Sequence, residues 1–148
     1  MRVLIVDDNA LIRAGIVTLL KKHGAFELIA EAADGLSAVD KARELQCDLV
    51  LMDISLNGVN GFSATRLIRD LLPQCRVLYV TNHVSAGMLA EAMNTGACGY
   101  IAKTDIVPDL ITGIAAVHRR EYFVSRSCVG LLPELGSRKC VLSDPPRP

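Results

Sequence analysis

The stretch Val3-Leu4-Ile5-Val6-Asp7-Asp8 joins a short apolar run directly to a pair of acids. A second run, Leu49-Val50-Leu51-Met52, is followed in the same way by Asp53. Short apolar runs bounded by charged or turn residues are typical of strands that are buried on both faces of a parallel sheet. In open α/β sheets, ligands bind beyond the carboxyl ends of the strands, so we expect the three acids to share one crevice.

This crevice would hold three like charges. Carboxylates that converge repel one another unless a cation neutralises them. A site whose ligands are all oxygen atoms suits Mg²⁺. The sequence therefore predicts a magnesium site built from Asp7, Asp8 and Asp53.

The length of 148 residues and the hydrophobic content of 51% predict one domain of ordinary size with a short extension. Acidic and basic side chains number sixteen each. Residues 1–118 carry thirteen acids and ten bases, whereas residues 119–148 carry three acids and six bases. An excess of three positive charges is too small to predict nucleic-acid binding, which usually requires a dense basic patch.

The five cysteines are scattered and form no C-x-x-C pair or other metal-ligand spacing; they are Cys47, Cys75, Cys98, Cys128 and Cys140. The chain passes from Met1-Arg2 directly into a predicted strand and shows no signal-peptide pattern. No stretch approaches the roughly 20 continuous apolar residues of a membrane helix. We therefore expect a reduced, soluble protein of the cytoplasm that does not contact a membrane.

Strands alternate with helices along most of the chain. Strand-like runs occur at about 3–6, 28–32, 49–52, 77–80 and 99–101. Helical spacing fills the intervals, with helices expected from about residue 10 after an Asn9 cap, at 35–46, after Gly61 up to Pro73, at 84–95 and at 106–118. This alternation predicts an α/β fold with right-handed crossovers and a mostly parallel, five-stranded sheet.

The pattern weakens beyond residue 120. Residues 122–125 and 129–132 could form one more short packed element, and the segment after Gly136, rich in Ser, Pro, Arg and Lys, has the composition of a linker. We therefore expect one domain over residues 1–120 and an extension over 121–148 that contains no complete output domain.

Two more polar residues follow predicted strands. Thr81 ends the fourth apolar run and Lys103 follows the fifth. Each could have a simpler explanation, since a threonine at a strand end often caps the next helix and a lysine is usually a solvated charge. Taken together, these residues form an ordered set: two acids after strand one, one acid after strand three, a hydroxyl after strand four and a lysine after strand five. This set indicates a functional site more specifically than any one of its residues does.

This constellation resembles the receiver domain of two-component response regulators over about residues 1–120. The stretches Met93-Asn94-Thr95-Gly96-Ala97 and Gly99-Tyr100-Ile101-Ala102-Lys103 also resemble the NarL/FixJ subgroup. The resemblance implies a flavodoxin-like, doubly wound sheet of order 2-1-3-4-5 with helices on both faces. It implies phosphorylation by a sensor histidine kinase, with Asp53 as the phosphoacceptor.

The same resemblance assigns the metal ligands and the switch. Mg²⁺ would be bound directly by Asp8 and Asp53, by the backbone carbonyl of Ser55, and through water by Asp7. Lys103 would supply a fixed positive charge. The Thr81 hydroxyl would bond a phosphoryl oxygen, and Tyr100 would then pack inward; the alternative for Tyr100 is an ordinary strand aromatic.

Three positions near this predicted site bear on how closely the family pattern applies. Asn57 and Thr104 stand where many receivers carry proline. His83, two residues after Thr81, could serve as a general base, but a solvent-facing loop histidine is the simpler expectation. In the first helix, Leu11, Ile12 and Ile16 could contact the kinase, and the competing explanation is that they belong to the core.

Several functions stay open at this point. Subgroup membership implies DNA binding through an output domain that residues 1–148 do not contain. The chain would then be either a receiver fragment of a transcription regulator or a stand-alone receiver that acts by protein contact. A homodimer is possible in both cases. An aspartyl-nucleophile phosphatase would need a second acid where Ser55 stands. A flavin binder would need a phosphate cradle where Asp7-Asp8-Asn9 stands, and a receiver that works by binding alone would not need all five residues. We expect no enzymatic turnover beyond self-phosphorylation and autodephosphorylation.

Overall fold

A seven-stranded parallel sheet organises the computed structural model, which describes residues 1–131 and 140–142. The strands lie in the order β2-β1-β3-β4-β5-β6-β7, and every neighbouring pair is parallel. In chain order they are β1 Arg2–Val6, β2 Leu28–Ala32, β3 Leu49–Met52, β4 Arg76–Thr81, β5 Gly99–Ala102, β6 Tyr122–Val124 and β7 Cys140–Leu142. The predicted parallel α/β fold and the order 2-1-3-4-5 are confirmed for the first five strands.

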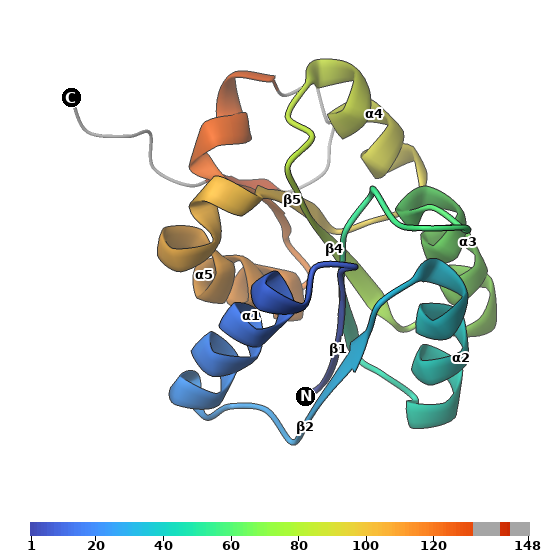
Figure 1. The fold of residues 1–148 in the computed structure, drawn as a ribbon. Coiled ribbons are helices and arrows are strands. Elements are labelled where there is room, and N and C mark those ends of the chain that lie inside the picture. The colour runs from blue at the N-terminus through green and yellow to red at the C-terminus, as the bar shows by residue number, and fades with distance from the viewer. Residues whose placement is uncertain (132–139, 143–148) are drawn as a thin grey trace.

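Helices on both faces connect these strands (Figure 1). Helices α1 and α5 cover one face, and α2, α3 and α4 cover the other. Their bounds agree with the predicted ranges to within small differences at the ends: α1 Ala10–His23, α2 Gly35–Leu45, α3 Gly61–Leu71, α4 Ala86–Asn94 and α5 Ile106–His118. Two 3-10 turns, η1 Lys103–Asp105 and η2 Arg126–Leu131, complete the described elements.

The start of α1 is fixed by the residue that the sequence indicated. The Asn9 side chain accepts hydrogen bonds from the backbone N–H groups of Leu11 and Ile12, at 2.9 and 3.2 Å. Such a cap satisfies donors that the first helical turn leaves without partners. Asn9 thereby begins α1 directly after the Asp7-Asp8 pair and keeps both acids at the end of β1.

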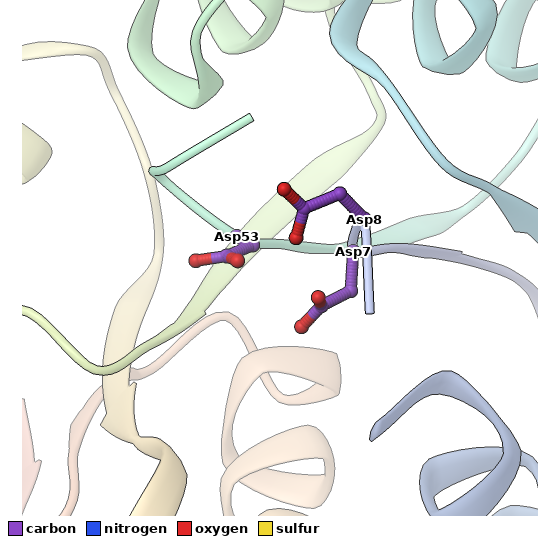
Figure 2. A group of neighbouring side chains, drawn as sticks. All are labelled: Asp7, Asp8 and Asp53. Atoms are coloured by element: carbon purple, nitrogen blue, oxygen red, sulfur yellow. The ribbon is translucent and has the colours of Figure 1, made fainter. Parts of the chain in front are cut away.

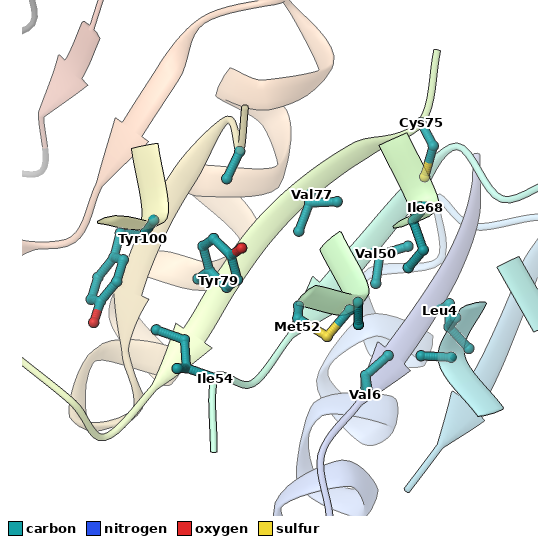
Figure 3. Packing of buried hydrophobic residues seen from close by; sticks show 14 of the residues in the cluster. Leu4, Val6, Val50, Met52, Ile54, Ile68, Cys75, Val77, Tyr79 and Tyr100 are labelled. Atoms are coloured by element: carbon teal, nitrogen blue, oxygen red, sulfur yellow. The ribbon is translucent and has the colours of Figure 1, made fainter. Parts of the chain in front are cut away.

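Alternate residues of the central strands enter two separate cores. On the α1/α5 side, strand residues pack with Ile16, Leu20, Leu110 and Ile114. On the other side, Leu4, Val6, Val50 and Met52 pack with residues of α2 and α3, including Ile68 (Figure 3). A sheet covered on both faces explains why its strands are continuous apolar runs. It also leaves the carboxyl edge of the sheet as the place where polar residues can gather.

The sheet extends beyond the five strands that the sequence predicts. The short packed element expected near residue 122 is confirmed as β6, which pairs with β5. Strand β7 pairs with β6 over residues 140–142, where a linker was expected, because this three-residue apolar run can continue the backbone ladder. The rest of the expected linker, 136–139 and 143–148, lies outside the described residues, and the division at residue 120 stays a prediction.

Two glycines make room for β6. A Cβ on Gly99 would lie 2.4 Å from the carbonyl oxygen of Phe123, and a Cβ on Gly113 of α5 would lie 2.8 Å from the Phe123 ring. Phe123 is fully buried between these elements.

Among the described helices, none is both long enough and apolar enough to cross a membrane.

We predict that Gly99→Ala lowers the free energy of unfolding by about 1–3 kcal/mol, because the added methyl group meets a strand backbone that cannot rotate away. Urea unfolding of the purified protein measures this change. Gly15→Ala in α1 is the matched control, since nothing lies within 4 Å of its Cβ position. That variant should gain up to about 1 kcal/mol from helix propensity. Equal effects of the two substitutions would contradict the close packing of β6 on β5.

Candidate functional site

Three acids meet at the carboxyl edge of the sheet. Asp7 and Asp8 directly follow β1, and Asp53 directly follows the neighbouring strand β3. One carboxylate oxygen from each residue lies within 4.8 Å of the other two. Figure 2 shows the three side chains gathered in one place. Asp7 and Asp53 are buried, whereas Asp8 is exposed. The structure therefore brings together the three acids that the sequence placed in one crevice.

Lys103 joins two of these acids from the other side of the site. It begins the turn η1 directly after β5. Its Nζ lies 2.7 Å from Asp7 Oδ2 and 3.0 Å from Asp53 Oδ2, and only 10% of the side chain is exposed. An ammonium held between two buried carboxylates compensates part of their mutual repulsion. The predicted position of Lys103 beside Asp53 is thus what the structure contains.

The acid–base properties of Asp53 follow from this environment. Burial raises the pKa of the Asp53 carboxyl above its ordinary value, and the nearby charge of Asp7 acts in the same direction. The hydrogen bond and charge of Lys103 act in the opposite direction without cancelling the rise. For Lys103, burial disfavours the ammonium, but the bonds and charges of Asp7 and Asp53 outweigh burial and raise its pKa. Lys103 is therefore a permanent cation at neutral pH.

The backbone holds Asp53 in place from two directions. Its N–H donates to the carbonyl of Val6 at 2.9 Å, and its Oδ1 accepts a hydrogen bond from the N–H of Ile54 at 2.8 Å. Gly61, the first residue of α3, packs so closely that a Cβ would lie 2.2 Å from the Asp53 carbonyl oxygen. Only glycine allows this approach. These contacts fix the backbone of Asp53 and one of its carboxylate oxygens at the carboxyl edge of the sheet.

The loop after β4 contacts the remaining predicted residues through His83. Thr81 ends β4, is fully buried, and accepts a hydrogen bond from the His83 N–H at 3.2 Å. Tyr100 of β5 is also buried, and its hydroxyl donates to the His83 carbonyl. The Tyr100 ring lies 6.3 Å from that of Tyr79, centroid to centroid. Thr81 and Tyr100 thus bind the same residue from opposite sides of its backbone.

His83 has a further contact that the sequence did not predict. Its side chain is exposed, as expected for a loop histidine, and its Nε2 contacts the Oγ of Ser55 in the loop after β3. The signal available in the sequence was positional, because Ser55 and His83 each lie two residues beyond a polar strand-end residue. This pair links the two loops that flank Asp53.

A second group was missed because it joins distant parts of the chain. Asp105 of η1 and Ser125, directly after β6, are both buried and are hydrogen-bonded through Ser125 Oγ and Asp105 Oδ2 at 2.7 Å. A single serine near the end of a weakly patterned segment carries no recognisable motif. The contact depends on the parallel pairing of β6 with β5, which short-range sequence patterns do not specify.

The donor atoms fit a hard divalent cation. Three carboxylates and one ammonium leave two negative charges at the site, which equals the charge that Mg²⁺ would neutralise. All three side-chain donors are oxygens, the ligands that Mg²⁺ prefers. The sequence expected a further ligand from the Ser55 carbonyl and an indirect role for Asp7; both stay predictions.

Comparisons with known proteins agree with this geometry. Residues 3–115 match the family described as response regulator receiver domain. The chain is 36% identical over 118 residues to the transcriptional regulatory protein LnrK of Bacillus subtilis, covering 80% of this chain and 54% of the relative. It is 35% identical over 121 residues to the response regulator protein VraR of Staphylococcus aureus, covering 82% and 58%. The chain thus spans just over half the length of these curated relatives.

A solved structure is similar over most of both chains. It is a two-component response regulator of the LuxR family from Aurantimonas, with a TM-score of 0.76 and 34% sequence identity. The similarity covers 80% of this chain and 85% of that chain. The described fold and the sequence comparison therefore point to one family.

We predict that Asp53→Asn stabilises the metal-free protein at pH 7 by about 1 kcal/mol. The native carboxylate is charged in a buried position near Asp7, which is unfavourable, and the amide removes that charge. Because the folded-state pKa of Asp53 is raised, its favourable contribution is complete below the unfolded-state pKa, about 3.9, and is lost as the pH rises through the folded-state pKa. The advantage of the variant should therefore shrink as the pH falls toward 4.

Urea unfolding in the presence of a chelator, repeated between pH 4 and pH 8, measures this dependence. Asp70→Asn on the exposed surface of α3 is the control and should leave stability nearly unchanged. A variant Asp53→Asn that is less stable than the native protein at pH 7 would show that Asp53 is a net stabilising charge and would contradict the prediction.

Proposed function

The chain belongs to the response regulator receiver domain family, and from this membership we propose that it is a phosphorylation-controlled switch of a two-component system. Asp53 would accept a phosphoryl group from a sensor histidine kinase. The observation that carries this proposal is the buried Asp53 carboxylate held 3.0 Å from the Lys103 ammonium and beside two further acids.

The proposed reaction requires positioning and charge compensation more than covalent catalysis. The Asp53 carboxylate would attack the phosphorus atom, forming an acyl phosphate as the bond from phosphorus to the donor breaks. Lys103 would remain beside the incoming phosphoryl oxygens as a fixed positive charge. Mg²⁺, held by Asp8, Asp53, the Ser55 carbonyl and, through water, Asp7, would supply the remaining positive charge.

The switch would operate through Thr81 and Tyr100. In the described state the Thr81 hydroxyl accepts from the N–H of His83, and its own hydrogen would donate to a phosphoryl oxygen on Asp53. Tyr100 holds the carbonyl of the same residue, and any displacement of His83 would therefore reach the Tyr100 ring. We propose that this shared residue couples phosphorylation to the surface formed by α4, β5 and α5.

The output is proposed from the relatives. LnrK is named a transcriptional regulatory protein, and the chain spans 54% of its length. We propose that this receiver controls transcription through a DNA-binding output domain outside residues 1–148, and that DNA is contacted only there. The second candidate is a stand-alone receiver that acts by protein contact, including a homodimer. An aspartyl-nucleophile phosphatase is disfavoured, because Ser55 occupies the position of its second acid.

Helix α1 offers a surface for the kinase. Leu11 is 83% exposed and lines a groove between α1 and α5 together with Val107, which is 81% exposed. Ile16 is buried and belongs to the core, whereas Ile12 is partly buried. We propose that Leu11 and Ile12 contact the kinase and that Ile16 supports them from beneath.

The same proposal includes cellular location and turnover. A cytoplasmic location is supported by the family and by four free cysteine thiols among the described residues. Burial raises the pKa of Cys47 to about 11 and that of Cys75 to about 12, which keeps both thiols protonated and unreactive. We propose no enzymatic activity beyond self-phosphorylation and autodephosphorylation.

Incubation with acetyl phosphate and Mg²⁺ should add one phosphoryl group to the native protein, as measured by intact mass. Asp53→Asn should abolish the gain, since the acceptor oxygen is replaced by an amide, and a chelator should reduce it strongly. Asp70→Asn serves as the matched carboxylate control and should be phosphorylated like the native protein. A native protein that gains no mass under any of these conditions would refute the proposed switch.

A further inference from the structure

The turn that carries Lys103 is short. Turn η1 contains only Lys103, Thr104 and Asp105, no side chain caps its start, and it runs directly into α5. Besides the backbone bond from the Ile106 N–H to the Lys103 carbonyl, contacts from a segment distant in the sequence bind both sides of this turn.

Those contacts come from the segment that follows β6. Ser125 Oγ accepts a hydrogen bond from the N–H of Ala102, directly before Lys103, at 3.0 Å. The same hydroxyl donates to Oδ2 of Asp105, the last residue of the turn, at 2.7 Å. One hydroxyl group thus binds the turn on both sides of Lys103. Ser125 is fully buried, so water cannot replace it.

Ser127 completes the attachment. The Asp105 carboxylate also accepts from the N–H of Ser127 at 2.9 Å and from its hydroxyl at 2.8 Å. A buried carboxylate is tolerated only when its oxygens are hydrogen-bonded, and Asp105 obtains three such bonds from the segment 125–127. The pairing is too complete to be an incidental surface contact.

The segment itself is firmly docked. The N–H of Ser125 donates to the carbonyl of Tyr100 at 3.0 Å, so the serine continues the backbone ladder between β5 and β6. Arg126 binds Asp109 of α5 through its guanidinium, with the shortest contact at 2.8 Å. This second contact binds the segment to the first turn of α5, four residues beyond Asp105. The segment is therefore attached at two places, the turn η1 and the start of α5.

We propose that Ser125 and Asp105 are positioning residues for Lys103, and that the Ser125 hydroxyl thereby connects the end of β6 to the phosphorylation site. This inference rests on the proposed function of the site and extends it to a part of the chain that contains no predicted site residue. The hydroxyl of Ser125 and the carboxylate of Asp105 set the turn that aims the ammonium at Asp53. Neither residue touches the reacting atoms.

Ser125→Ala is the direct test, because it removes the hydroxyl and keeps the backbone bond to Tyr100. Arg126→Gln is the matched control, since it weakens the other anchor of the same segment. Both variants should lose stability in urea unfolding. Only Ser125→Ala should slow phosphorylation by acetyl phosphate, by about 10-fold or more, as a displaced catalytic group does.

A direct readout of Lys103 separates positioning from general loosening. The side-chain NMR signals of isotopically labelled lysine report the environment of each ammonium, and Lys103→Arg identifies the signal of Lys103. Ser125→Ala should shift this signal, whereas Arg126→Gln should leave it in place. The other four lysines of the chain serve as internal references. Should Ser125→Ala fail to fold, Asp105→Asn tests the same connection with a side chain of equal size.

The outcomes are distinct. An unmoved Lys103 signal and native phosphorylation in Ser125→Ala would overturn the proposal, and so would equal shifts in Ser125→Ala and Arg126→Gln. Because the NMR measurement uses the unphosphorylated protein, it reports on positioning even if the native chain gains no phosphoryl group. A shifted signal without phosphorylation of the native protein would therefore refute the proposed function and leave the positioning role standing.

Discussion

The Lys103 ammonium lies between Asp7 and Asp53 and balances part of their charge, which ties the ends of three strands to one another. Three carboxylates within 4.8 Å are unfavourable in a partly buried crevice, and the lysine is the described cation that compensates two of them. The lysine directly follows β5, whereas the acids directly follow β1 and β3. The sheet must therefore hold three strands in register before the charges can balance.

This dependence explains how rigidly the neighbouring backbone is built. Asp53 is fixed by a bond to β1 and by the close approach of Gly61, and the loop after β4 is fixed by Thr81 and Tyr100. The bonds between Asp53 and Val6 and between Tyr100 and His83 join segments that are distant in the sequence. A displacement of one of these loops would therefore disturb its neighbours.

The sequence predicted the elements whose signals are local. The apolar runs that end at Asp7, Asp53 and Thr81 predict buried strands. The polar residue at the end of each run also predicts the site, because it lies where the buried strand ends. The Asn9 cap is equally local. Strands β6 and β7 were less predictable, since each has only three residues and β6 depends on space left by glycines in β5 and α5. The contact between Asp105 and Ser125 depends on the pairing of β6 with β5, so the sequence did not predict it either.

The parallel pairing of β6 with β5 has a consequence for synthesis of the protein. A chain emerges from the ribosome with its N-terminal end first, and parallel neighbours can pair only after the whole crossover helix between them has appeared. Asp7, Asp53 and Lys103 are thus all available well before Ser125 can close the turn beside the lysine. The nascent chain would hold its Asp53 carboxylate while its lysine is still unanchored, so the site would be complete only when β6 joins the sheet.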